Sequence, residues 1–351
     1  MIISAWSALS PFGHGRAAFA DGVRRGARVV PVPTKDDWAS AEACVVPDFD
    51  VVEQLGRKGT SSMDRTSALA VATLRALQRD EDGAILPGPT TGVVLGTTSG
   101  SARTQFEFTR DSLIRRRPYF VNPAQMPFAL MNSAAAQCAM WHGLTGPNST
   151  VAAGRVAGPA VLRYASRLLR TGRANGVFAG AVEEHSGARE LLEHGQPLGE
   201  GAVLLFLQTT SAGNLPRLAE VVASDTRFRD GEPRRALAES LRHVMAGSTL
   251  DEVWGLALCA AEPELSEVED DAAGEVLGQQ VGTVVRPGQL IGDTGAASGV
   301  FGLAALLAHA ETDASARGRL AVATSVDRDG TAGCVVLRLV GSVHQARARG
   351  E

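Results

Sequence analysis

The chain has 351 residues, 44% of them hydrophobic, and a formal net charge of −4. This length predicts two coupled α/β halves rather than one small core, and the charge argues against nucleic acid as the main partner. The four cysteines, Cys44, Cys138, Cys259 and Cys334, form no Cys-x-x-Cys pair and favour a reducing compartment. No basic leader and no run of 18 apolar residues is present, so we expect a soluble, cytoplasmic protein without a membrane partner.

The first hundred residues predict strands and helices in alternation. Residues 1–6 form an expected first strand, and the proline-containing residues 28–49 an expected surface excursion. An Ala/Leu-rich helix is expected from Met63 to about residue 77, followed by a buried strand from Gly92 that ends in a Gly/Thr/Ser turn. The glycines of that turn match neither a dinucleotide-binding nor a P-loop spacing, so we expect no nucleotide site.

A strand, a sharp turn and a helix follow one another at residues 146–170. Residues 149–153 predict a buried strand, Gly154 permits the turn, and the next residues have apolar side chains at helical spacing. Arg163, Arg167 and Arg170 lie on a different face of that helix. Such a turn presents its residue at a helix N-terminus, which favours a nucleophilic anion. The residue presented is Arg155, which cannot be a nucleophile.

A weak internal repeat supports two halves. A Gly-rich turn followed by an Ala/Leu-rich helix occurs at residues 154–169 and again at 292–309. Each half also ends on a strand, at residues 202–207 and 334–339. Strands that alternate with helices indicate an α/β protein.

Gly-Pro-Asn-Ser-Thr-Val at residues 146–151 resembles the segment that precedes the active cysteine of β-ketoacyl synthases. The runs 118–123 and 131–146 upstream, and Gly-Val-Phe-Ala-Gly-Ala-Val-Glu at 176–183 downstream, follow the same family pattern. The resemblance implies a thiolase-like fold of two pseudo-symmetric halves in α-β-α-β-α layers, with halves at residues 1–210 and 215–342 and a tail at 343–351. It also implies no cofactor and no metal.

The catalytic residues of that family are replaced in this chain. In the alignment without gaps the family's cysteine falls on Arg155, its first histidine on Cys259 and its second histidine on Asp293. The family's lysine falls on Gly288, and its gating loop appears as Val-Asp-Arg-Asp-Gly-Thr-Ala at residues 326–332. Claisen condensation needs a thiolate and donors to the oxyanion. We therefore expect no catalytic residue, with Arg155, Cys259, Asp293 and Gly288 as vestigial positions.

Other readings of single residues carry less weight. Cys259 is a displaced nucleophile or, more commonly for a lone cysteine at a strand end, a small buried hydrophobe. His142 and His185 lack metal-ligating neighbours and are expected to be structural. Asp293-Thr-Gly resembles an aspartic protease signature, but it runs into an Ala-rich helix, whereas those proteases are all-β.

The resemblance implies a catalytically silent partner subunit, similar to the chain length factors of type II polyketide systems. The usual chain length factor has glutamine where this chain has Arg155, and the chain is shorter than typical members, which favours a polyene-forming, highly reducing system. We expect a heterodimer with an active ketosynthase, which brings the acyl carrier protein. The alternatives are an independent thioesterase or acyltransferase on the same fold, and a homodimeric acyl-binding scaffold.

The same resemblance places a set of residues at the subunit interface and acyl tunnel. Phe106 and Phe108 lie in a segment that the residues alone leave as helix or loop, and they are either core aromatics or tunnel residues. Arg115, Arg116 and Arg117 form either a solvated turn or a contact for an acidic carrier protein. The full tunnel and interface set is Thr104, Phe106, Phe108, Gln125, Met126, Ala129, Ser133 and Val151.

The cation at Arg155 generates one further expectation. A buried guanidinium at a helix N-terminus is unfavourable unless an anion compensates it. The family fold brings the positions of Arg155 and Asp293 into contact. We predict a charge-assisted hydrogen bond between these two residues, joined by Glu262.

Overall fold

The computed structural model describes residues 1–34, 42–79, 85, 87–193, 197–209, 215–278 and 281–340. The expected boundary between the halves, at 210–214, and the expected tail at 343–351 lie outside these residues, as do residues 35–41 of the expected surface excursion. Among the described residues, every helix is too short or too polar to cross a bilayer.

The chain folds into two halves that repeat one strand order. The first half orders its strands β6-β5-β7-β8-β1 and the second β11-β10-β12-β13-β9, with parallel and antiparallel pairs at equivalent places. The halves join where Ile2 and Ile3 of β1 pair with β9. The strands are β1 (Ile2–Ser10), β2 (Gly13–His14), β5 (Gly92–Thr97), β6 (Asn148–Ala152), β7 (Gly176–Glu183), β8 (Gly201–Gln208), β9 (Ala219–Phe228), β10 (Val253–Ala257), β11 (Thr283–Val285), β12 (Leu320–Val326) and β13 (Thr331–Leu339).

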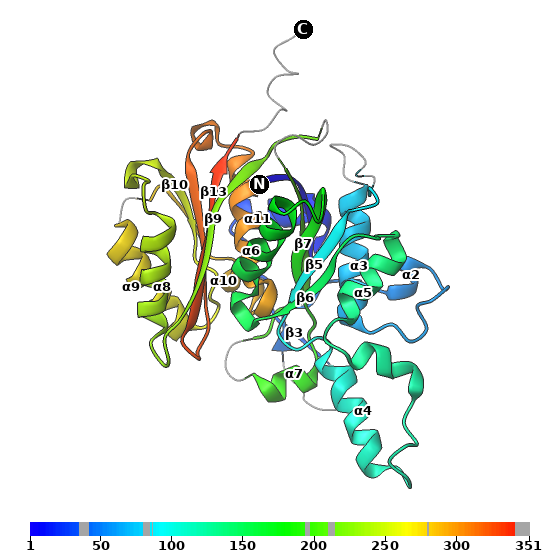
Figure 1. Cartoon of the computed structure of the whole chain (residues 1–351). Helices are drawn as coiled ribbons and strands as arrows, with labels where there is room; N and C mark the ends of the chain where they lie inside the picture. Colours follow the sequence, from blue (N-terminus) through cyan, green and yellow to red (C-terminus); the bar gives the residue numbers. More distant parts are fainter. Residues whose placement is uncertain are drawn as a thin grey trace.

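Helices separate and cover the two half-sheets, which gives the five α-β-α-β-α layers expected (Figure 1). The middle layer holds α1 (Gly15–Arg24), α6 (Ala157–Arg170) and α11 (Ser298–Ala310). The outer layers hold α3 (Arg65–Gln78) and α5 (Ser133–His142) on one side, and α8 (Pro233–Val244) and α9 (Pro263–Leu277) on the other. The shorter elements are β3 (Val32–Pro33), β4 (Glu42–Ala43), α2 (Val51–Leu55), η1 (Pro123–Ala129), η2 (Gly154–Val156), α7 (Gly187–Leu192), η3 (Leu250–Glu252), α10 (Pro287–Ile291), η4 (Gly295–Ala297) and η5 (Ala314–Ala316).

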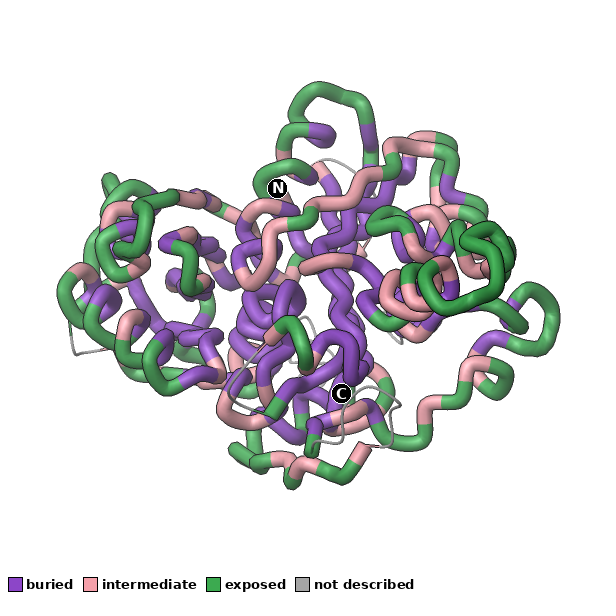
Figure 2. Tube along the Cα trace, turned by 90° about the horizontal axis from the view of Figure 1, so that it is seen from below, coloured by how far each residue is buried: buried purple, intermediate pink, exposed green. Residues whose placement is uncertain are grey.

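Three hydrophobic clusters correspond to the three helix layers. The largest lies between the half-sheets, where the ring of Phe19 contacts those of Trp6 and Phe301, with centroids 6.0 and 5.2 Å away. The buried residues are concentrated in the central strands and helices, and the exposed ones at the periphery (Figure 2). Burial on both faces explains why the central strands β5, β7, β8 and β12 are mostly apolar along their whole length.

A segment after β5 extends away from this body. Helix α4 (Ala102–Ile114) projects from the lower edge of the first half (Figure 1) and packs against η1. Ser101 caps α4 by accepting a hydrogen bond from the Thr104 N–H. We call residues 102–131 the arm. Residues 104–113, which the sequence left as either helix or loop, are helical.

Two local expectations need correction. The strand at residues 149–153 was expected to be buried, but β6 is the edge strand of the first half-sheet and is partly exposed. An apolar run predicts a strand without telling whether a neighbouring strand covers its outer edge. Of the expected surface excursion, residues 28–34 are exposed or partly exposed as predicted, but residues 43–46 enter the core, because Cys44 and Val46 are buried and the Cys44 N–H donates to Leu198 O.

Candidate functional site

The turn between β6 and α6 presents Arg155, as the sequence predicts. Gly154 has a φ of +51°, and a Cβ there would lie 2.5 Å from Asp327 Oδ2, so both the backbone angle and the space require glycine. The Arg155 N–H donates to the same Asp327 oxygen at 3.1 Å. The chain then enters α6 through η2, so Arg155 lies at the N-terminal end of that helix.

Four carboxylates surround the Arg155 guanidinium, whose side chain is 13% exposed. Its Nη2 lies 2.5 Å from Asp293 Oδ2 and 2.8 Å from oxygens of both Glu193 and Glu262. Its Nη1 lies 3.2 Å from Asp327 Oδ1. Because Nη2 carries two hydrogens, it serves two of its three oxygens with well-directed bonds and contacts the third electrostatically. We call these five residues the elbow cluster.

The predicted contact between Arg155 and Asp293, joined by Glu262, is confirmed by these distances. Glu193 and Asp327 were not predicted. Asp327 lies in the segment expected to replace the family's gating loop. Its negative charge, opposite to that of Arg155, is the one feature of the sequence that could have identified it as a partner. Glu193 follows α7 in the shortened stretch before β8, where neither periodicity nor resemblance identifies a partner for Arg155.

Two more arginines offset part of the remaining negative charge. Arg328 donates to Glu262 Oε2 at 2.8 Å. Arg189, which is 3% exposed, contacts Glu193 Oε1 at 3.2 Å and donates to the backbone oxygens of Glu184, Gly199 and Asp293. The cluster therefore joins side chains from both halves of the chain.

The charges shift the pKa values within the elbow cluster. Burial alone would lower the pKa of Arg155, but Asp293, Glu193 and Asp327 raise it, so the guanidinium stays charged. Burial alone would raise the pKa of Asp293, but Arg155 and Arg189 hold it below its usual range. The pKa of Glu262 is raised by burial, which Arg155 and Arg328 offset in part.

The space that a reacting group would need is filled. The cavity at Arg155, Cys259 and Asp293 measures about 10 Å³, close to the space of a single water molecule. At Gly288, the position expected to replace the family's lysine, a Cβ would lie 2.7 Å from Cys259 O and 2.8 Å from Ala261 N, so the backbone leaves no space for a side chain. The four positions expected to be vestigial thus come together in one place, but they leave no room for a substrate there.

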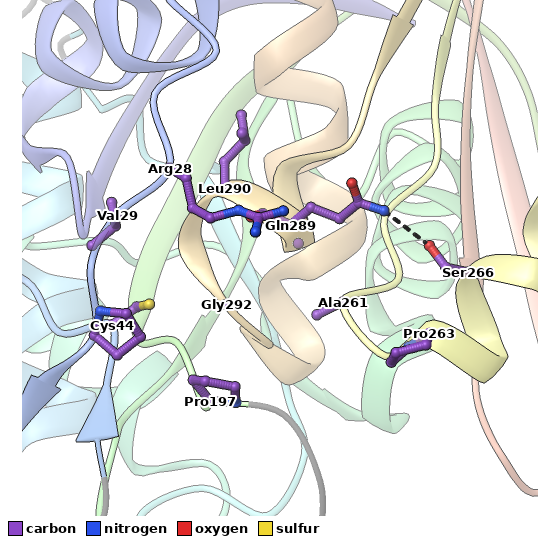
Figure 3. Close-up of a pocket in the computed structure, with 12 residues that line it drawn as sticks. Arg28, Val29, Cys44, Pro197, Ala261, Pro263, Ser266, Gln289, Leu290 and Gly292 are labelled. Carbon is purple, nitrogen blue, oxygen red and sulfur yellow. Dashed lines mark hydrogen bonds between the residues drawn. The ribbon is translucent and has the colours of Figure 1, made fainter.

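A larger cavity of about 450 Å³ lies beside this site (Figure 3). Its polar lining consists of Arg28, Cys44, Ser266 and Gln289, and the Gln289 amide donates to Ser266 Oγ at 3.4 Å. The lining contains no carboxylate or imidazole that could serve as a general base. The cavity therefore offers no substitute for the lost catalytic residues.

The other candidate residues have structural partners. Cys259 is 2% exposed, and burial raises the pKa of its thiol well above the usual value, which disfavours a nucleophilic thiolate. His142 contacts Gln78 and Val71 O, and His185 contacts Glu190. The described residues contain no group of three or more His, Cys, Asp or Glu that could hold a metal ion.

The tunnel and interface set divides into two groups. Thr104 and Ser133 are buried within this chain, where their hydroxyls contact Ser101 and Ser67 at 2.8 and 3.2 Å, so they do not face outward. The other members are at least partly exposed and belong to the arm or to β6: Phe106, Phe108, Gln125, Met126, Ala129 and Val151. Phe106 and Phe108 belong to none of the three hydrophobic clusters.

Removal of the central cation is expected to destabilise the fold. Arg155→Gln leaves buried carboxylates without their guanidinium, which typically costs about 3–5 kcal/mol. Urea unfolding at about pH 7 measures this loss, and adding Asp293→Asn should recover part of it. Arg25→Gln is the control, because it breaks an exposed pair with Asp21 worth less than about 1 kcal/mol. A similar small effect of both single variants would contradict the role of the cluster.

The pH dependence gives a second readout of the same variant. In the wild type, Asp293 has a lowered pKa, so its contribution to stability is present above its unfolded pKa of about 3.9 and is lost as pH falls through the folded pKa. Without Arg155, burial raises that pKa above the unfolded value, and ionisation of Asp293 opposes folding. The difference between wild type and Arg155→Gln should therefore shrink as pH falls from about 7 to about 4. A constant difference would show that charge is not the cause.

Thiol reactivity tests the alternative nucleophile. All four cysteines are buried and unpaired, and burial raises the pKa of Cys44 to about 11 and of Cys334 to about 12. We expect no fast reaction of the native protein with a thiol reagent, and reaction of all four thiols after unfolding. Rapid labelling of native wild type that Cys259→Ser abolishes would instead identify Cys259 as an accessible thiol.

Comparisons with known proteins agree on one family. The model of the β-ketoacyl synthase N-terminal domain matches residues 3–197. The 3-oxoacyl-[acyl-carrier-protein] synthase 2 of Synechocystis sp. is 28% identical over 189 residues, which cover 52% of this chain and 45% of that protein. The corresponding protein of Vibrio harveyi is 26% identical over 154 residues, or 43% of this chain and 36% of that protein. The chain thus spans less than half the length of these curated relatives.

Solved structures extend the similarity to the second half. A chain of "The ishigamide ketosynthase/chain length factor" is 40% identical, with a TM-score of 0.90, over 97% of this chain and 99% of that one. A chain of the AntDE:AntF complex, a type II polyketide synthase carrier protein with its ketosynthase, shares the fold at 16% identity and a TM-score of 0.77, over 97% of this chain and 99% of that one. The match to the domain model and the 40% identity to a solved structure show more than a shared fold. This chain belongs to the β-ketoacyl synthase family.

Proposed function

We propose that this chain is the catalytically silent, chain length factor-like subunit of a type II polyketide synthase. In this role it pairs with a cysteine-bearing ketosynthase, which brings the acyl carrier protein, and shapes the tunnel in which the chain grows. The observation that carries the proposal is Arg155 at the nucleophile position, surrounded by four carboxylates. A guanidinium cannot accept an acyl group, and a cavity of about 10 Å³ cannot admit one.

The exposed surface supports pairing with a second chain. Eight of the 18 large hydrophobic residues that are exposed in the described part of the chain lie between residues 113 and 140, in the arm and α5. These are Leu113, Ile114, Tyr119, Phe120, Met126, Leu130, Met131 and Met140. Such a concentration on one side of a molecule is typical of a protein–protein interface. The outer edge of β6 lies beside it and can pair with a strand of the partner.

The similarity to a chain of the ishigamide ketosynthase/chain length factor covers nearly all of both chains, which supports membership in such a ketosynthase-like pair. We extend the proposal to a polyene-forming, highly reducing pathway. The ground is the arginine in place of the glutamine of usual chain length factors. The product of the reconstituted system tests this extension separately from the pairing.

Reconstitution tests the assignment. The chain should co-purify with the intact ketosynthase in a stable heterodimer that buries well above about 2,000 Å², and condensation should require the partner's cysteine. Arg155→Cys should restore no activity to this subunit, since both histidines and the lysine are also replaced. Acyl-thioester turnover by the isolated chain would instead support the independent enzyme. A monodisperse monomer that gains no stability from the ketosynthase would contradict the pairing.

Chain length provides the test of the tunnel. If Phe106 or Phe108 forms the tunnel floor, its replacement by alanine removes a ring and should lengthen the product made by the complex. Mass spectrometry of the released products measures the shift, and Phe228→Ala is the control, because Phe228 is exposed on β9 outside the arm. An unchanged product distribution from both variants, in intact complexes, would contradict a role in the tunnel.

A further inference from the structure

Helix α6 has one exposed face that is purely cationic. Its apolar side chains, such as Val161, Leu162 and Leu168, are buried in the middle layer. Its outer face exposes Arg163, Arg167 and Arg170, and the helix contains no acidic residue. Their spacing of four and three residues puts them on one side of the helix, over about 10 Å of its length. We call these three residues the arginine stripe.

The arginine stripe lacks carboxylate partners in the part of the chain that the structure describes. Arg163 Nη1 contacts the neutral Thr226 Oγ1 at 3.4 Å. Several other exposed arginines do pair with acids: Arg229 with Glu239, Arg234 with Glu275, and Arg235 with Glu232. The stripe is therefore a concentration of positive charge on a chain whose net charge is negative.

The stripe is continuous with the exposed edge of the first half-sheet. Tyr164, next to Arg163, is 37% exposed, and its hydroxyl accepts a hydrogen bond from Ser149 Oγ of β6 at 3.3 Å. Helix α6 lies between the two half-sheets, where it packs against β7, β9 and β5 and also contacts the edge strand β6 (Figure 1). A chain that pairs with the edge of β6 therefore brings its own equivalent helix beside the stripe.

From this placement we infer that the arginine stripe selects an acidic partner and opposes self-association. In a two-fold symmetric pair, the same patch of each chain forms the interface, and side chains close to the axis lie near their own copies. Two copies of this chain would oppose three arginines with three arginines, which repel. A ketosynthase with carboxylates on the equivalent helix face would convert that repulsion into ion pairs. This inference rests on the proposed pairing with a second chain of the same fold, and it names the chemistry of that partner.

The test uses the full chain and a charge-reversed copy, Arg163→Glu/Arg167→Glu/Arg170→Glu. Analytical ultracentrifugation should find each protein monomeric alone, and their equimolar mixture dimeric at low salt, with an apparent Kd at least about tenfold lower than that of either protein alone. Raising the salt to about 0.5 M should weaken the mixed dimer, because the attraction is screened. The control is Arg57→Glu/Lys58→Glu/Arg317→Glu, which makes the same change in net charge at exposed residues outside α6 and should give no mixed dimer.

Three outcomes would overturn the inference. These are a salt-insensitive dimer of the wild type alone, a mixture that associates no more than its components, and co-elution of the wild type with nucleic acid that charge reversal abolishes. The ultracentrifugation experiment uses no ketosynthase, so it can fail while the proposed function holds, and the reverse. A ketosynthase that binds the charge-reversed copy as tightly as the wild type would remove the stripe from the interface and leave the pairing intact.

Discussion

The buried charge of Arg155 is the constraint on which the rest of the site depends. A cation at a helix N-terminus is opposed by the helix dipole and by burial, so it requires anions close by. Four separate segments supply them, after α7, before α9, before η4 and after β12. In the alignment that we propose, Asp293 and Asp327 fall where the family has a catalytic histidine and the gating loop. The replacements therefore form one physical unit, in which an arginine at the nucleophile position and acids around it stabilise each other.

Much of this site follows from the sequence, and the reasons for the rest are physical. The turn at Gly154 and the helix after it were predictable from a short motif. The contact with Asp293 was predictable because the resemblance implies a fold that brings its position to Arg155, whose charge requires an anion. Glu193 and Arg189 were not, since they come from a short helix and the chain after it, without a motif that places them near Arg155. The sequence did not predict the exposure of β6. The alternation of side chains shows which face of a strand is buried, but not whether another strand lies along its edge.

The filled site and the exposed arm point to function at the surface. Inside, a Cβ at Gly288 would meet backbone atoms, and the space beside Arg155 holds no more than about one water. Outside, the arm presents Tyr119, Phe120 and Met131, which a folded chain normally covers. Stability in this chain thus comes from sealing the region where relatives of the family hold reacting groups. The surface that remains available is the one that a second subunit would cover.

Helix α6 contributes both to the stability of the chain and, through the arginine stripe, to the selection of a partner. At its N-terminus the dipole disfavours Arg155, and four carboxylates surround that residue. Toward its C-terminus the dipole favours Arg167 and Arg170, which need no carboxylate in the isolated chain. Apolar contact supplies affinity but distinguishes poorly between two chains of the same fold, whereas unpaired charges reject one partner and accept another. The N-terminal end of α6 therefore contributes to the stability of the chain through Arg155. Its C-terminal part, with Arg167 and Arg170 at the surface, contributes to the choice of partner.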